Sequence, residues 1–145
     1  MTVIAWDGKT LAADRKACFG DTEYATQKLW PLADGGALAF CGDLDCGMSM
    51  KRWHEEGADI LKWPEFQKSE RWAMLIIARP GQPVIIYEKL PEAFSYLDPI
   101  QAWGSGREVA LGAMAMGADA IQAVEVASRF IHNCGRGHDF IVVNK

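Results

Sequence analysis

The residue in the most distinctive chemical position is Thr2, which becomes the first residue once Met1 is removed. A threonine hydroxyl is a poor nucleophile until a base takes its proton, and an N-terminal threonine carries such a base in its own α-amine. A free α-amine titrates near about 7.7 to 8.0, which suits proton transfer at neutral pH. The simpler alternative is that Thr2 is an ordinary threonine of a β-strand.

Other groups that could do chemistry have simpler interpretations. His132, Cys134 and His138 lie near one another, but no fourth ligand follows at a spacing familiar from zinc sites. The run 54–56 (His-Glu-Glu) is typical of the solvated face of a helix. The sequence has no Walker loop and no dinucleotide fingerprint. We therefore expect neither a metal nor a cofactor.

Composition indicates one compact domain spanning residues 1–145, because half of the residues are hydrophobic. The formal net charge is -4, without a long block of like charge that would mark a nucleic-acid site. Signal-peptide and membrane-spanning patterns are absent from the sequence. We expect a cytoplasmic protein without nucleic-acid or membrane partners, whose cysteines stay reduced.

The element that must position Thr2 is a hairpin. Apolar residues cluster at 3–6 and 11–13, with an Asp-Gly pair between them that strongly favours a tight turn. A second extended pair, 24–32 and 37–41, is separated by Ala-Asp-Gly-Gly. Over 46–61 apolar residues recur at alternating steps of four and three, which predicts an amphipathic helix.

The second half predicts strands followed by two helices. Residues 105–116 are rich in Ala, Leu and Met and end at Gly117, as expected of a helix. Asp119 and Gln122 form a capping-box signal for the next helix. Strands are expected over 72–78, 84–88, 100–103 and 140–143. Hairpins rather than crossovers predict an α+β fold, a four-layer αββα sandwich of two antiparallel sheets flanked by helices.

Several short motifs together resemble one family. Residues 2–6 (Thr-Val-Ile-Ala-Trp), the hairpin, and 11–15 (Leu-Ala-Ala-Asp-Arg) resemble the opening of proteasome β subunits and of the related peptidase HslV, which are N-terminal-nucleophile (Ntn) hydrolases. Gly-Ser-Gly at 104–106 is similar to a later motif of that family. The element order resembles the family over nearly the whole chain. The resemblance implies a minimal bacterial or phage-type member.

This resemblance implies roles for five residues. Asp14 and Lys28 fall on the catalytic aspartate and lysine, and Gly42 falls on the glycine whose N–H helps to form the oxyanion hole. Ser105 falls on a serine near the nucleophile. Thr2 would attack a peptide carbonyl while Lys28, held by Asp14, favours the deprotonated hydroxyl. Taken singly, Asp14 and Lys28 would be a turn carboxylate and a solvated strand lysine.

Spacing supports Thr2 as the family's nucleophile. Relative to the family, the intervals from Thr2 to Asp14 and from Asp14 to Lys28 are each shortened by an even number of residues. Since side chains alternate along a strand, an even change preserves the face on which each side chain lies. The interval from Lys28 to Gly42 matches the family without a gap.

A second set of positions matches the substrate-specificity pocket of the family. Two of its members, Phe40 and Leu44, could equally be core residues. The complete set is Ala17, Cys18, Thr26, Phe40 and Leu44.

The sequence departs from the family in the loop after the last helix, where His132 and Gly135 stand in place of an aspartate and a serine. We expect processing by removal of Met1 rather than by self-cleavage of a long leader. The resemblance implies a threonine peptidase that cleaves peptides or unfolded protein within a homo-oligomeric ring; whether an ATPase unfoldase assists is open. Two alternatives also stay open: an inactive assembly module, and an Ntn hydrolase of small amides.

Overall fold

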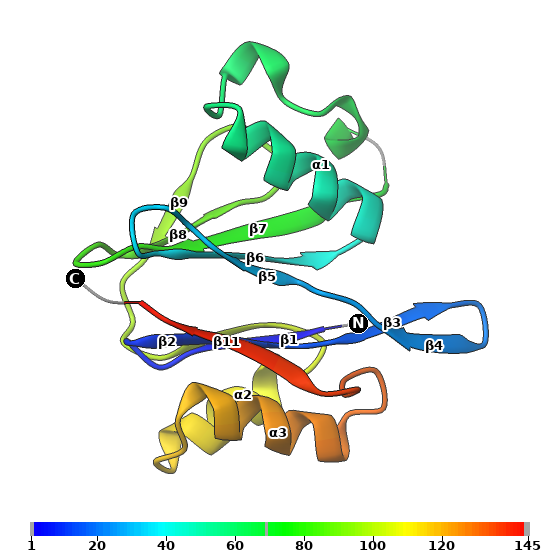
Figure 1. The fold of residues 1–145 in the computed structure, drawn as a ribbon, viewed down its shortest axis with the longest axis vertical. Coiled ribbons are helices and arrows are strands. Elements are labelled where there is room, and N and C mark those ends of the chain that lie inside the picture. Colours follow the sequence, from blue (N-terminus) through cyan, green and yellow to red (C-terminus); the bar gives the residue numbers. More distant parts are fainter. Residues whose placement is uncertain (1, 69, 144–145) are drawn as a thin grey trace.

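The computed structural model of the chain describes residues 2–68 and 70–143. Figure 1 shows two sheets lying face to face, with helices outside each of them. The strands are β1 (Val3–Trp6), β2 (Thr10–Asp14), β3 (Lys16–Phe19), β4 (Thr22–Ala25), β5 (Leu29–Pro31), β6 (Ala37–Gly42), β7 (Ala73–Ala78), β8 (Val84–Tyr87), β9 (Phe94–Tyr96), β10 (Gln101–Gly104) and β11 (His138–Val142). The α-helices are α1 (Leu44–Glu55), α2 (Arg107–Ala115) and α3 (Ala120–Phe130), and short 3-10 turns lie at Ile60–Lys62 and Glu65–Lys68.

The first sheet has the strand order β10-β1-β2-β11, with antiparallel pairs throughout. Strand β1 is an interior strand, hydrogen-bonded to β2 on one side and β10 on the other. Its register pairs Ile4 with Ala13 and Val3 with Gly104. Thr2, immediately before β1, is therefore placed between the end of β2 and the end of β10.

The second sheet has the order β5-β6-β7-β8-β9 and is also antiparallel. Strand β6 is buried from Ala37 to Cys41 and ends at Gly42, opposite Ala73 of β7. Strands β3 and β4 form a separate hairpin that projects sideways from the two sheets (Figure 1). Gly42 and Thr2 thus belong to facing sheets.

Three apolar clusters hold these parts together. One lies between the sheets and includes Ile4, Leu11 and Ile76. A second, rich in alanine, joins the first sheet to α2 and α3, and a third joins the other sheet to α1. Contact between α1 and the second sheet is tight, because a Cβ on Gly47 would lie 2.1 Å from the ring of Phe40.

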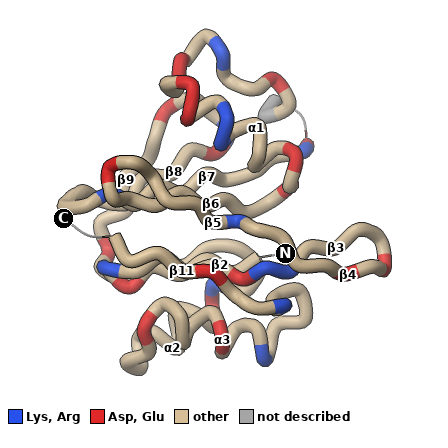
Figure 2. The backbone as a smooth tube through the Cα atoms, in the orientation of Figure 1, with Lys and Arg blue, Asp and Glu red and all other residues tan. Residues whose placement is uncertain are grey.

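Figure 2 shows basic and acidic residues interspersed over these elements.

The α+β fold class is confirmed, as are the first hairpin and the capping box at Asp119. One prediction is wrong: the helix expected over 46–61 ends at Glu55. Gly57 then adopts a φ of +103°, and Ile60 and Leu61 are exposed on a 3-10 turn. Strands β3 and β9 were not predicted. Among the described residues, no helix is long and apolar enough to cross a bilayer.

Candidate active site

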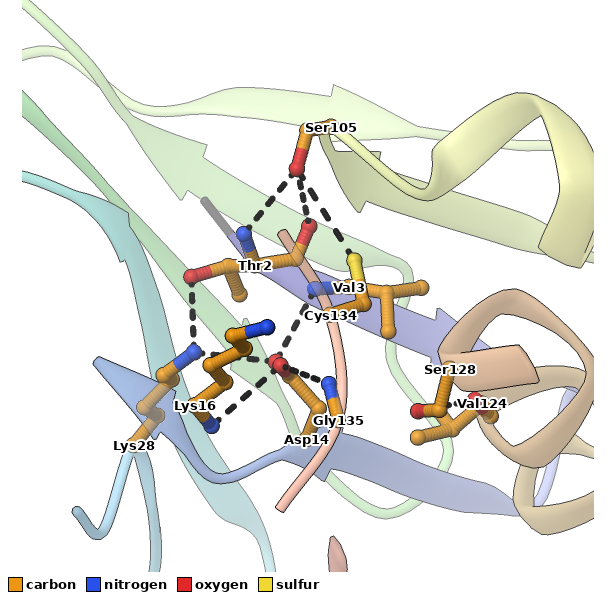
Figure 3. Close-up of polar contacts among 10 residues, drawn as sticks. All are labelled: Thr2, Val3, Asp14, Lys16, Lys28, Ser105, Val124, Ser128, Cys134 and Gly135. Atoms are coloured by element: carbon orange, nitrogen blue, oxygen red, sulfur yellow. Dashed lines mark hydrogen bonds and ion pairs between the residues drawn. The ribbon is translucent and has the colours of Figure 1, made fainter. Parts of the chain in front are cut away.

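The residues singled out in the sequence lie at one end of the facing sheets, and Figure 3 shows the side chains of Thr2, Asp14, Lys28 and Ser105. Each comes from the end of a strand or from the residue beside it, where the backbone leaves the sheet. They are Thr2 before β1, Asp14 at the end of β2, Lys28 before β5, Gly42 at the end of β6 and Ser105 after β10.

Lys28 joins the threonine to the aspartate. Its Nζ donates to Thr2 Oγ1 at 3.0 Å and to Asp14 Oδ1 at 2.9 Å. All three residues are buried, with exposed fractions of 3% for Thr2, 1% for Lys28 and none for Asp14. The ammonium therefore lies beside the hydroxyl, where it stabilises the alkoxide form over the neutral hydroxyl.

Backbone N–H groups fix the carboxylate of Asp14. Val3 donates to Oδ1 at 3.1 Å, while Gly135 at 3.0 Å and Lys16 at 3.3 Å donate to Oδ2. Buried charge is costly unless it is paired and hydrogen-bonded. Here the ion pair with Lys28 and three N–H donors together meet that need.

Ser105 holds the other side of Thr2. The backbone nitrogen of Thr2 donates to Ser105 Oγ at 3.2 Å, and this hydroxyl in turn lies 3.3 Å from the Thr2 carbonyl oxygen. With Met1 attached, the Thr2 nitrogen is a peptide N–H, and it stands in for the α-amine that removal of Met1 would create. Met1 lies outside the described residues, so its removal stays a prediction.

The backbone at position 42 requires a glycine. Its φ is +108°, and a Cβ at this position would lie 2.7 Å from the carbonyl oxygen of Trp72 and 2.9 Å from Cα of Ala73. Any other residue would be strained and would collide with β7. The next residue, Asp43, caps α1 by accepting from the N–H of Cys46 at 3.0 Å.

A cavity of about 380 Å³ opens beside Thr2, Lys28 and Gly42. Three of the five residues expected in a substrate pocket, Ala17, Cys18 and Leu44, line it. Thr26 instead lines a separate depression with Arg15 and Asp139. Phe40 is 1% exposed in the core, where its ring stacks on Trp30. The remaining lining residues are Lys16, Phe19, Asp43, Asp45 and Arg71.

Charged residues that the sequence analysis did not single out surround this cavity. Lys16 Nζ donates to the carbonyl oxygen of His132 at 2.5 Å and pairs with Glu23 at 2.9 Å. Arg71 forms ion pairs with Asp43 at 3.0 Å and Asp45 at 3.2 Å. Its guanidinium lowers the pKa of Asp43. No local motif reveals these residues, because folding alone brings Arg71 to the start of α1.

The loop that departs from the family supports the site through its backbone. His132 supplies a carbonyl oxygen to Lys16, and Gly135 supplies an N–H to Asp14. Between them, buried Cys134 lies with its Sγ 3.8 Å from Ser105 Oγ. Burial and the Asp14 charge raise the pKa of this thiol. Within the described residues, no three His, Cys, Asp or Glu side chains are grouped to hold a metal ion.

Comparison with known proteins identifies the fold. No protein-family model matches the chain, and no curated protein matches it significantly. Solved structures do match over nearly the whole chain. HslV from Trypanosoma brucei has a TM-score of 0.74 and 19% identity, with 100% of each chain covered. BPH from Thiobacillus denitrificans, in complex with epoxomicin, has a TM-score of 0.73 and 17% identity, again with 100% of each chain covered.

Anbu from Hyphomicrobium sp. strain MC1 also matches, with a TM-score of 0.71 and 13% identity over 99% of this chain and 82% of that one. These likenesses agree with the resemblance found in the opening hairpin and in the Gly-Ser-Gly motif. The chain therefore has an HslV-like, proteasome-type fold.

Proposed function

We propose that this protein is a threonine-type peptidase in which Thr2, freed by removal of Met1, is the nucleophile. The observation that carries the proposal is the buried contact of Lys28 Nζ with both Thr2 Oγ1 and Asp14 Oδ1, at 3.0 and 2.9 Å. Burial of a charged lysine costs free energy, so a buried lysine beside a hydroxyl indicates that its charge has a role. Activation of the threonine hydroxyl is such a role.

In the first half-reaction, Thr2 Oγ1 attacks the carbonyl carbon of the substrate while its proton passes to the α-amine, directly or through a water. The ammonium of Lys28 stabilises the developing negative charge on the attacking oxygen. The N–H of Gly42 donates a hydrogen bond to the oxyanion of the tetrahedral intermediate and stabilises it. Collapse of the intermediate breaks the C–N bond, and the departing amine takes the proton from the α-amine of Thr2.

In the second half-reaction, a water attacks the acyl ester and gives a proton to the α-amine. The C–O bond to Thr2 then breaks, and Thr2 Oγ1 recovers its proton. Ser105 would orient the amine in both steps, because its Oγ lies 3.2 Å from the Thr2 nitrogen. Asp14 acts through Lys28, whose charge it holds in place.

The substrate would be a peptide or unfolded protein that places the residue before the scissile bond in the cavity lined by Ala17, Cys18 and Leu44. The proposal includes the four-layer αββα arrangement of Ntn hydrolases, a homo-oligomeric assembly and a cytoplasmic location. The shared fold of HslV and BPH supports the first of these, the αββα arrangement.

Trapping tests the proposal directly. Epoxomicin, the ligand in the Thiobacillus denitrificans BPH structure, is incubated with protein whose intact mass shows removal of Met1. We expect one adduct per chain, which peptide mapping places on Thr2, and hydrolysis of fluorogenic peptides that stops when the adduct forms. The matched variants are Thr2→Ala, which should lose both adduct and hydrolysis, and Thr2→Ser, which should keep both. Hydrolysis retained by Thr2→Ala would exclude Thr2 as the nucleophile.

A further inference from the structure

A second cavity, of about 480 Å³, adjoins the candidate site, and the mechanism above places no part of the substrate in it. Its lining includes Gly42 and Ser105 together with the large side chains of Trp72, Met74 and Trp103. We name it the Trp72 cavity. The two cavities differ in the chemistry of their walls. Aromatic and thioether groups line the Trp72 cavity. The first cavity is instead lined by five charged side chains, those of Lys16, Lys28, Asp43, Asp45 and Arg71.

The position of the Trp72 cavity relates it to the reaction. Gly42 lines both cavities, while Thr2 and Lys28 line only the first. Ser105, which accepts from the Thr2 nitrogen at 3.2 Å, lines the Trp72 cavity. Thr2 thus has its hydroxyl toward Lys28, which lines the first cavity, and its nitrogen toward Ser105, which lines the Trp72 cavity (Figure 3).

The path of the proton determines which part of a substrate lies in which cavity. The α-amine of Thr2 takes the hydroxyl proton and must return it to the departing nitrogen of the substrate. That nitrogen must therefore lie on the same side of Thr2 as the α-amine, and this is the side where Ser105 and the Trp72 cavity lie. We propose that the Trp72 cavity binds the residue that directly follows the scissile bond, and that it selects large apolar or aromatic side chains. This assignment rests on the proposed peptidase function.

The walls account for the selectivity. The rings of Tyr96 and Trp103 lie 5.9 Å apart between centroids, and Trp72 and Met74 add further apolar surface. Aromatic rings favour offset or edge contacts with another ring, and a thioether adapts to its shape. Arg107, also among the lining residues, bears a positive charge and is half-exposed. A lysine or arginine after the scissile bond should therefore be disfavoured by poor contact with the rings, and also by the like charge of Arg107, whose ion pair with Glu108 is long, at 3.9 Å, and exposed.

The experiment uses internally quenched peptides that share every residue before the scissile bond and differ only in the residue after it, which is Phe, Leu, Ala or Lys. A peptide aldehyde with the same leading residues is measured in parallel, because it ends at the reactive carbonyl and leaves the Trp72 cavity empty. We expect kcat/KM for Phe to exceed that for Ala by at least about tenfold, with Lys lower still.

Two variants of opposite size isolate the cavity. Met74→Trp should fill the cavity and reduce the ratio of kcat/KM for the Phe peptide to that for the Ala peptide to about one. Trp72→Ala should also lower this ratio, because it removes the ring that contacts the Phe side chain. In both variants the inhibition constant of the aldehyde should stay within about twofold of wild type. A loss of aldehyde binding in step with peptide hydrolysis would instead place the cavity on the acyl side and overturn the assignment.

The failure of this assignment is distinguishable from that of the proposed function. Hydrolysis of all four peptides at equal kcat/KM would overturn the role of the Trp72 cavity and leave the peptidase function standing. Wild-type protein that has lost Met1 yet hydrolyses none of the peptides and does not bind the aldehyde would overturn both.

Discussion

The N–H of Gly135 donates to Oδ2 of Asp14 at 3.0 Å, so the loop after α3 reaches back to the carboxylate that holds Lys28. This loop is itself fixed by Arg15, whose N–H is shared between the carbonyl oxygens of Gly135 and Gly137, each at 3.1 Å. Gly135 has a φ of +144°, a conformation that a residue with a Cβ rarely adopts. The positive φ therefore favours a glycine at the position whose N–H makes this contact.

Replacement of that glycine should destabilise the protein through its backbone. A Cβ at Gly135 meets no atom within 4 Å, so Gly135→Ala introduces strain rather than a collision. We expect a loss of about 1–3 kcal/mol in the free energy of unfolding, measured by urea denaturation. Gly112→Ala is the matched control: it also has open space but lies within α2, and it should stabilise by up to about 1 kcal/mol. Equal effects at the two positions would contradict this account.

Removal of the Asp14 charge should affect both stability and activity. Asp14→Asn leaves the ammonium of Lys28 buried without its counterion, a change that costs about 3–5 kcal/mol in comparable cases. Activity should also fall, because Lys28 loses the group that directs it to Thr2. Asp139→Asn serves as the control, since Asp139 pairs with the exposed Arg15 and its loss should barely shift the urea midpoint. Unfolding and peptide hydrolysis are measured on the same preparations.

The ion pair of Arg71 with Asp43 predicts a pH dependence of stability. Hydrogen bonding to Arg71 lowers the pKa of Asp43 in the folded state, so the pair stabilises the fold above the pKa of the unfolded aspartate, about 3.9. This stabilisation is lost as the pH falls through the lower, folded pKa. Asp43→Asn retains an N-cap for α1 but not the charge.

Wild type should therefore melt above Asp43→Asn near neutral pH, and the difference should shrink as the pH falls below about 4. Calorimetry at a series of pH values measures both melting temperatures. A gap that stays constant down to about pH 2 would show that the cap geometry, and not the charge, distinguishes the two proteins.

Alkylation should report occupancy of the cavity beside Thr2. Cys18 lines this cavity and is only partly buried, whereas Cys41, Cys46 and Cys134 are buried. Burial raises the pKa of Cys41 to about 11, which keeps that thiol protonated and unreactive at neutral pH. Maleimide should label Cys18 first, and a peptide aldehyde bound at Thr2 should slow this labelling. Cys18→Ser is the control; unchanged labelling with the aldehyde bound would separate Cys18 from the substrate path.

Local patterns predicted the parts of the fold that depend on alternation and turn chemistry. The Asp-Gly turn and the alternating faces of 3–6 and 11–13 were enough to predict the hairpin that carries Thr2 and Asp14 to the same end. The predicted helix over 46–61 failed because apolar spacing continues past Glu55, although Gly57 breaks the backbone there. Periodicity alone does not tell an exposed 3-10 turn from a helix face.

The surroundings of the site depend on contacts between distant segments. Phe40 could be a pocket residue by the family resemblance or a core residue, and the close approach of Gly47 places its ring in the core beneath α1. Arg71 and Trp72 contribute to the two cavities from a segment that carries no motif. Their placement follows from the pairing of β6 with β7, which no local pattern specifies.

The interior position of β1 has a consequence for the rate of any reaction at Thr2. Because β2 and β10 flank this strand and the Val3 N–H is bound to Asp14, the backbone beside Thr2 loses its freedom of motion during folding. In the proposed mechanism, the attacking oxygen and the amine base of Thr2 are then held in one orientation before a substrate arrives. A flexible segment would lose conformational entropy at each turnover. Here that entropy is lost only once, when the sheet forms.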